Sequence, residues 1–437
     1  MVSLRPLAEI EGVMKRIKMY SEPGKSKENI DSYFQNRSEK AVEDFIESYW
    51  DQITIHQPSD VGLRIGLPHP FLVPNKDMFQ EMYYWDSFFT CVGLVGSSRE
   101  QLIIDTTENF FALIDRFGKI PNSSRFYHLG RSQPPFLSSL VSMSLDVMEH
   151  RADASEANQE WLTRAVEALV KEYWGVWRGT VHPDEREVYR GLSRYSDMDL
   201  WSHGAEAESG WDMTPRFFDR CLDFIPIDLN SLLYKYEKDI ARFSSLLGKA
   251  AETAHWEELA SKRAETVREL CWDDSNGFFF DFDYKKEQRS SFQSLAGFFP
   301  MWAGLATPEQ AERMVTEALS NFEKDFGLVT TEEWHTPEGE VPRQWAWPNG
   351  WAPLHWIVVG GLERYGYQTE ANRIASKWVD LVASVYEQDA LVYEKYDVVS
   401  GARGADDRYP TQTGFGWTNG VFSGFTRYLR GDLMLPI

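Results

Sequence analysis

The stretch Leu162-Thr163-Arg164-Ala165-Val166-Glu167-Ala168-Leu169-Val170-Lys171 carries the pattern that decides the fold of this chain. Its apolar residues recur every three or four positions and would line one face of an α-helix, with charged residues opposite. Similar spacing, or a high content of helix-forming residues, recurs along most of the sequence. We predict helices near 5–19, 38–56, 85–95, 99–117, 135–150, 157–176, 227–246, 252–272, 290–304, 307–321, 350–364, 368–388 and 416–430.

Strand patterns are few and short, near 278–282 and 391–396. No glycine-rich phosphate loop follows a strand, which argues against a nucleotide-binding fold. No Pro-, Ser- or Gly-rich linker divides the 437 residues. We therefore predict an all-α fold in a single domain over residues 1–437, in which helical hairpins close into a toroid.

The composition restricts the possible partners and the expected location. A net charge of -22 argues against nucleic acid or an anionic membrane as a partner, because both require basic surface. The three cysteines are widely spaced and form no disulfide or metal pattern, which favours a reducing compartment. Residues 1–20 lack the apolar run of a secretory signal, and no stretch of about 18 apolar residues occurs. We expect a cytoplasmic protein with no membrane span.

Long polar loops separate the helical segments, at 57–80, 118–136, 177–212, 324–350 and 396–414. The motifs that could carry chemistry lie in or beside these loops, as expected when function depends on loops above a rigid scaffold. Aromatic residues make up 14% of the chain, including 17 Trp. Many must be core residues, but aromatic walls with a few placed polar groups are also typical of a sugar pocket.

Two acidic stretches are candidates for the two halves of one active site. Asp212 follows Trp211, an apolar neighbour that would keep the carboxyl protonated, and Glu394 precedes Lys395, which would favour the charged form. Two carboxyl groups whose pKa values are pushed apart are what glycosidic bond cleavage requires. Spacing alone does not distinguish this pair from unrelated surface acids.

Further candidates lie in three loops. Trp85 offers a stacking surface and Asp86 can accept two hydroxyl hydrogen bonds, although the pair would also suit a helix start. The loop at 120–135 gathers amides and guanidinium groups before a Pro-Pro helix entry, and the loop at 344–353 holds three Trp within seven residues. The histidines are scattered, without zinc spacing, and we predict no metal site and no cofactor.

In these residues the chain resembles the trehalase family of glycoside hydrolases. The resemblance runs from about Phe71 to Trp417 and rests on motifs that match in order. They are Phe79-x-Glu81-x-Tyr83-x-Trp85-Asp86, Ile120-Pro121-Asn122 with Arg131-Ser132-Gln133-Pro134-Pro135, Ser209-Gly210-Trp211-Asp212, Pro226-x-Asp228-Leu229-Asn230, Gln344-Trp345-x-x-Pro348-x-Gly350-Trp351-x-Pro353, Glu394-Lys395-Tyr396-Asp397-Val398 and Gly414-Phe415-Gly416-Trp417-Thr418-Asn419-Gly420.

The resemblance implies an (α/α)6 barrel and a metal-free, inverting hydrolase that cleaves α,α-trehalose to two glucoses. It implies that Asp212 is the general acid and that Glu394 is the general base that activates water. By the resemblance, the residues that line the sugar site are Trp85, Asp86, Asn122, Arg131, Gln133 and Gly210. Our further candidates for substrate binding are Phe79, Tyr83, Ser132, Gln344, Trp351 and Arg408.

Three positions depart from the family pattern. Met78 stands where the family has a sugar-binding Arg, Ala346 where it has Asp, and Arg408 where it has Glu. Because Arg suits a carboxylate, the last change suggests an anionic leaving group, so hydrolysis of glucosylglycerate, mannosylglycerate or another α-glucoside is the alternative. A catalytically inactive sugar-binding protein and a structural helical repeat are the other interpretations. The retained Asp212 and Glu394 argue against both.

Overall fold

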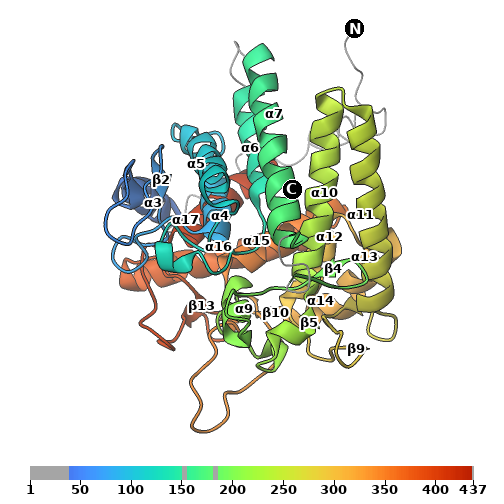
Figure 1. Ribbon diagram of the computed structural model, residues 1–437. Helices are drawn as coiled ribbons and strands as arrows, with labels where there is room; N and C mark the ends of the chain where they lie inside the picture. Colours follow the sequence, from blue (N-terminus) through green and yellow to red (C-terminus); the bar gives the residue numbers. More distant parts are fainter. Residues whose placement is uncertain (1–38, 150–154, 181–185, 436–437) are drawn as a thin grey trace, which may run out of the picture.

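The computed structural model describes residues 39–149, 155–180 and 186–435. This part of the chain is mostly helical, with short strands and long loops that lie mainly in the lower part of the view in Figure 1. The predicted helix at 5–19 lies outside the described residues.

Six helices form an inner ring. They are α4 (Tyr84–Cys91), α6 (Leu137–Glu149), α10 (Ile227–Leu246), α12 (Phe299–Ala303), α15 (Ala352–Arg364) and α17 (Gly416–Arg430). Each packs against the next in this order, and α17 packs back against α4, so the ring is closed. Every residue of α4 is buried, as are residues 352–362 of α15, because these helices face apolar neighbours all round.

The helices that alternate with the inner ones in sequence form the outer layer. They are α3 (Glu39–Ile53), α5 (Gln101–Phe117), α7 (Ser155–Glu172), α11 (Ala250–Cys271), α13 (Pro308–Arg313) with α14 (Leu319–Phe322), and α16 (Gln368–Asp389). Helix α5 shows why they lie outside: residues such as Ile103, Phe110 and Ile114 are buried, whereas the opposite face is polar. The predicted all-α toroid, an (α/α)6 barrel, is confirmed.

Helices α4 and α17 approach unusually closely, and glycines make this possible. A Cβ atom on Gly420 would lie 2.2 Å from the main-chain oxygen of Phe89, and one on Gly93 would lie 2.6 Å from the Cα of Gly420. Only glycine fits at such a backbone contact. The contact fixes the end of α4 and the 3₁₀ turn η1 (Val92–Leu94) against the first turns of α17. The first turn of each helix supplies residues to the pocket described below.

The strands are all short and pair in small antiparallel sheets. They are β1 (Thr54–Ile55), β2 (Phe71–Leu72), β3 (Glu187–Tyr189), β4 (Leu192–Ser193), β5 (Phe224–Ile225), β6 (Trp272–Asp273), β7 (Phe278–Phe279), β8 (Phe282–Asp283), β9 (Gln288–Arg289), β10 (Glu323–Lys324), β11 (Gly327–Leu328), β12 (Asn349–Gly350), β13 (Tyr396–Asp397) and β14 (Ala402–Arg403). The sheet β12–β13–β14 pairs Gly350 with Tyr396 and so joins the loop before α15 to the segment that holds Glu394.

Several predicted boundaries were wrong. The predicted strand at 278–282 is split between β7 and β8, because Phe280 and Asp281 lie between the two pairings. Of the strand predicted at 391–396, only Tyr396 lies in a strand, β13, while Tyr393 forms an isolated antiparallel bridge with Thr413. The helix predicted at 290–304 begins as a 3₁₀ turn at Leu295. A helix, α9 (Ser202–Glu208), forms within the predicted loop 177–212. None of the described helices is long and apolar enough to cross a membrane.

Candidate active site

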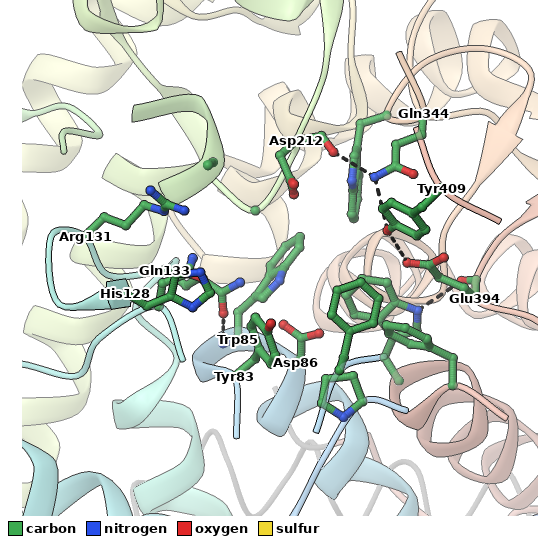
Figure 2. A pocket seen from close by; sticks show the side chains of 18 residues that line it. Tyr83, Trp85, Asp86, His128, Arg131, Gln133, Asp212, Gln344, Glu394 and Tyr409 are labelled. Carbon is green, nitrogen blue, oxygen red and sulfur yellow. Dashed lines mark hydrogen bonds between the residues drawn. The ribbon is translucent and has the colours of Figure 1, made fainter. Parts of the chain in front are cut away.

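A cavity of about 190 Å³ opens where α4, α6, α15 and α17 begin (Figure 2). Its lining comes from several separate parts of the chain. The residues are Pro74, Phe79, Tyr83, Trp85, Asp86, Asn122, His128, Arg131, Gln133, Ala207, Gly210, Asp212, Gln344, Trp345, Glu394, Tyr409, Phe415 and Trp417. Most predicted site residues are therefore brought together here. Ser132, Trp351 and Arg408 do not line this cavity.

Three carboxylates, those of Asp86, Asp212 and Glu394, point into this cavity (Figure 2). Loss of water on burial is the largest effect on each group and raises its pKa, to about 8 for Asp86, about 6 for Asp212 and about 7 for Glu394. The positive charges of Arg408 and Arg131 oppose the rise at Asp212. Such perturbed acids in a cleft mark a functional site.

Asp212 was expected to be protonated and Glu394 charged, but burial raises the pKa of both carboxyl groups. Lys395 lowers the pKa of Glu394, as expected from their adjacency, but burial of Glu394 outweighs it. At Asp212, the positive charges of Arg408 and Arg131 moderate the corresponding rise. The sequence showed one neighbour of each acid, whereas the fold adds the charges that face it from other loops.

Glu394 is held from several directions. Its Oε1 accepts a 2.7 Å hydrogen bond from the Tyr409 hydroxyl, and Oε2 accepts a longer one, 3.4 Å, from the main-chain N–H of Gln412. The Glu394 carbonyl oxygen accepts a 3.0 Å hydrogen bond from the indole N–H of Trp417. These contacts fix the position of the Glu394 carboxylate at the wall of the cavity.

The backbone that follows Asp212 is fixed in the same way. The Asp212 carbonyl oxygen accepts a 2.8 Å hydrogen bond from the side-chain amide of Gln344, and the Met213 carbonyl accepts one of 3.1 Å from the N–H of Trp345. The N–H of Thr214 donates to the buried Glu206 carboxyl at 2.7 Å. The loop before α15 therefore positions the segment that carries Asp212.

Aromatic rings form one wall of the cavity. The Trp85 ring lies 5.5 Å from that of Trp345, which stacks on Trp351 at 4.0 Å with an interplanar angle of 2°. Gly210 allows the chain to pass Trp85, because a Cβ there would lie 2.6 Å from the Trp85 ring and its φ is +78°. Trp351, predicted to contact the sugar, instead supports Trp345 from behind.

Polar groups face the cavity beside this wall. The Gln133 side-chain oxygen accepts from the N–H of Trp85 at 3.1 Å, so its NH₂ group is oriented by the first turn of α4. Arg131 forms an ion pair with Asp197 at 3.0 Å, yet its Nε has no hydrogen-bond partner within the described part of the chain. Burial lowers the pKa of His128, which also lines the cavity, to about 4. These groups can bind hydroxyls.

Ser132 and Arg408 have other positions. Ser132 is fully buried; its N–H donates to Glu208 at 2.7 Å and its hydroxyl to the Ile120 carbonyl at 2.7 Å, so it holds the loop and does not contact the cavity. Arg408 lines a second cavity, of about 300 Å³, together with His203, Met213 and Arg343 among others. Of the other departures from the family pattern, Met78 is exposed and Ala346 is buried.

The lining residues that sequence reasoning missed are mainly aromatic: His128, Trp345, Tyr409, Phe415 and Trp417. Trp345, Phe415 and Trp417 lie within the quoted motifs, so the concentration of rings in loops was the available signal. Within the described residues, no group of three or more His, Cys, Asp or Glu side chains could hold a metal ion.

A closed ring of helices with buried carboxyl groups in an aromatic pocket defines the class of helical-barrel glycoside hydrolases. The family model described as Trehalase matches residues 11–199 and 184–429, so the chain belongs to the trehalase family and is a glycoside hydrolase.

Solved structures agree with this assignment. Neutral trehalase Nth1 from Saccharomyces cerevisiae is 31% identical, with a TM-score of 0.73, and the match covers 84% of this chain and 76% of the yeast chain. A GH63 mannosylglycerate hydrolase from Thermus thermophilus, solved with Tris and D-glycerate, is 18% identical, with a TM-score of 0.66 over 88% of this chain and 100% of its own. The second likeness concerns the fold alone.

Proposed function

We propose that this protein is an inverting α-glycosidase that hydrolyses α,α-trehalose to two glucose molecules. The observation that carries the proposal is the pair of buried carboxyl groups, Asp212 and Glu394, which line one sugar-sized, aromatic-walled cavity. Membership of the trehalase family and the likeness to the yeast neutral trehalase support the choice of substrate.

In the proposed mechanism, protonated Asp212 donates its proton to the glycosidic oxygen as the bond to the anomeric carbon breaks. Ionised Glu394 takes a proton from water while the water oxygen attacks the opposite face of that carbon. The products are one α-glucose and one β-glucose. Asp86, Arg131 and Gln133 hold the hydroxyls of the cleaved sugar, and Trp85 and Trp345 pack against its ring.

A second candidate substrate is an α-glucoside with an anionic leaving group, such as glucosylglycerate, or the related mannosylglycerate. Arg408 favours it, because this exposed guanidinium lines the cavity beside the Asp212–Met213 segment and lies near enough to lower the pKa of Asp212. A leaving group protonated by Asp212 would depart on that side.

We also propose a cytoplasmic location, supported by three buried free thiols.

The test is hydrolysis of trehalose, glucosylglycerate, mannosylglycerate and maltose, with the product anomers followed by proton NMR. Equal initial amounts of α- and β-glucose from trehalose support the first proposal, and cleavage of the glycerate glycosides alone supports the second. Asp212→Asn and Glu394→Gln should each lower kcat by about 10³-fold. The exposed Asp274→Asn variant is the control and should retain full activity. Full activity in either site variant contradicts the assigned roles.

A further inference from the structure

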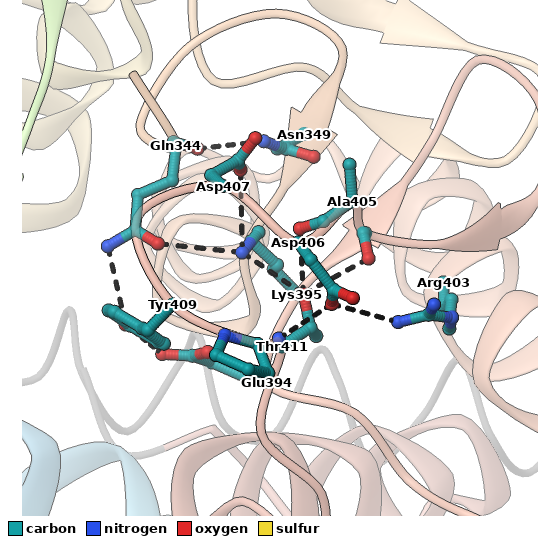
Figure 3. Close-up of polar contacts among 12 residues, drawn as sticks. Gln344, Asn349, Glu394, Lys395, Arg403, Ala405, Asp406, Asp407, Tyr409 and Thr411 are labelled. Atoms are coloured by element: carbon teal, nitrogen blue, oxygen red, sulfur yellow. Dashed lines mark hydrogen bonds and ion pairs between the residues drawn. The ribbon is translucent and has the colours of Figure 1, made fainter. Parts of the chain in front are cut away.

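Lys395, the residue next to Glu394, is completely buried. Its ammonium lies 3.5 Å from the Asp407 carboxylate, 3.2 Å from the Thr411 hydroxyl and 3.5 Å from the side-chain oxygen of Gln344 (Figure 3). The ring centroids of Trp351 and Tyr409 lie 5.7 and 5.8 Å from it. Burying an ammonium costs several kcal/mol unless its donors are used, so these contacts must compensate for the cost.

The position of Lys395 fixes the orientation of the Gln344 amide. An ammonium only donates hydrogen bonds, so the Gln344 oxygen must face Lys395 and its NH₂ must face away. That NH₂ then donates to the Asp212 carbonyl at 2.8 Å and to the Tyr409 oxygen at 3.3 Å. The opposite amide orientation would place NH₂ against NH₃⁺ and is excluded by repulsion.

The direction of donation continues to Glu394. Because the Tyr409 oxygen accepts from Gln344, its single proton is free for the 2.7 Å hydrogen bond to the Glu394 carboxylate. We infer that Lys395 is a positioning residue. It fixes the direction of the hydrogen bonds that Gln344 donates to Tyr409 and that Tyr409 donates to Glu394. Glu394 must then accept a hydrogen bond, as the ionised base does. The inference rests on the proposed function, in which Glu394 activates water.

The charges around Lys395 and Glu394, the two ends of this series of hydrogen bonds, are consistent with that role. The negative charge of Asp212 favours the protonated form of Glu394, and Glu394 in turn favours the protonated form of Asp86. Lys395 and the Tyr409 hydrogen bond are the main opposing influences. Asp407 and Asp406 lie on the far side of Lys395, where Asp406 accepts from the N–H of Thr411 at 2.9 Å and so closes the loop over the ammonium. Without this cation, burial would leave Glu394 protonated at higher pH.

The experiment is the pH profile of kcat/KM for Lys395→Met, which removes the charge and the donors but keeps an apolar chain of similar length. We expect kcat to fall at least ~10-fold and the acidic limb, which reports ionisation of the base, to move up by about one pH unit. The exposed, helix-surface Lys262→Met is the matched control and should leave the limb unchanged. A folded Lys395→Met enzyme with an unmoved limb overturns the inference.

A second variant covers the case in which Lys395→Met does not fold. Gln344→Met interrupts the donor chain but leaves the cation in place, so the limb should move up by a smaller amount. An unmoved limb in this variant also overturns the inference. Where both single variants fold, the double variant should resemble Lys395→Met, because the two residues act in series. Additive losses of kcat in the double variant would count against the inferred series of hydrogen bonds. Full activity of Glu394→Gln would instead refute the proposed function itself.

Discussion

The Tyr409 hydroxyl donates a 2.7 Å hydrogen bond to Oε1 of Glu394 across a separation of 15 residues. The same hydroxyl oxygen lies 3.3 Å from the Gln344 amide, which also binds the Asp212 carbonyl. One tyrosine therefore links the segments that carry both candidate catalytic carboxyl groups, and the geometry of the pair depends on it.

Tyr409→Phe should lower kcat about 10-fold with a smaller change in KM. The hydrogen bond from Tyr409 lowers the pKa of Glu394, so its loss raises that pKa and moves the acidic limb of the kcat/KM profile to higher pH. Steady-state kinetics across the acidic and alkaline limbs are the measurement. Tyr367→Phe, at the start of α16, is the control and should match the parent. An unshifted limb would show that the hydroxyl does not act on the base.

Arg408→Ala should move the alkaline limb of the profile to higher pH. Arg408 lowers the pKa of Asp212, so without it Asp212 keeps its proton to a higher pH and remains a competent acid. Because the two carboxyl groups interact, the limbs belong to the pair, and the shift between variants is the quantity to compare. Arg403→Ala, in the same loop but paired with Asp406, is the control. A shift to lower pH would place Arg408 away from Asp212.

The helical ring could be predicted from the sequence because it depends on a local pattern. A stripe such as that of Leu162, Val166 and Leu169 defines its own buried face wherever the helix packs. The short strands could not be predicted in the same way: β12 and β13 exist because Gly350 meets Tyr396 from another loop, and nothing in either segment encodes the partner.

The site was predictable to the extent that ordered motifs identify residues, but the contacts that set their roles are long-range. Trp351 was expected at the sugar, yet it stacks behind Trp345 because the turn between them folds the two rings face to face. The pKa of Asp212 likewise depends on Arg408 and Arg131, which the local sequence around Asp212 does not include.

Gly210→Ala should impair both stability and activity. The added Cβ would lie 2.6 Å from the Trp85 ring, and the positive φ adds roughly 1–2 kcal/mol of strain for a non-glycine residue. Gly118→Ala is a matched control, because Gly118 also has a positive φ, +74°, but nothing lies within 4 Å of its Cβ position. We expect a larger loss of Tm for Gly210→Ala and a fall in kcat/KM that Gly118→Ala does not show. Equal losses of Tm in the two variants would mean that the Trp85 ring can move aside for the added methyl group without a loss of stability.

Glu172 should make stability depend on pH in a direction opposite to that of a salt-bridged acid. It is completely buried and accepts hydrogen bonds from Tyr84, Tyr236 and Trp177, but burial still raises its pKa to about 7, from an ordinary value of 4.5. A raised folded-state pKa gives a contribution that is complete below the unfolded value and is lost as pH rises through the folded one.

Glu172→Gln mimics the protonated form. It should therefore reduce the slope of the unfolding free energy against pH, between about pH 4.5 and 7, by an amount that corresponds to close to one bound proton. Urea unfolding at fixed pH steps would measure this slope. The exposed Glu258→Gln provides the comparison, because the pKa of Glu258 is lowered by its hydrogen bond with Lys262, so its contribution has the opposite sign. If Glu172→Gln leaves the slope unchanged, the three donors hold the carboxyl ionised in the folded protein, and its burial must be offset by them in full.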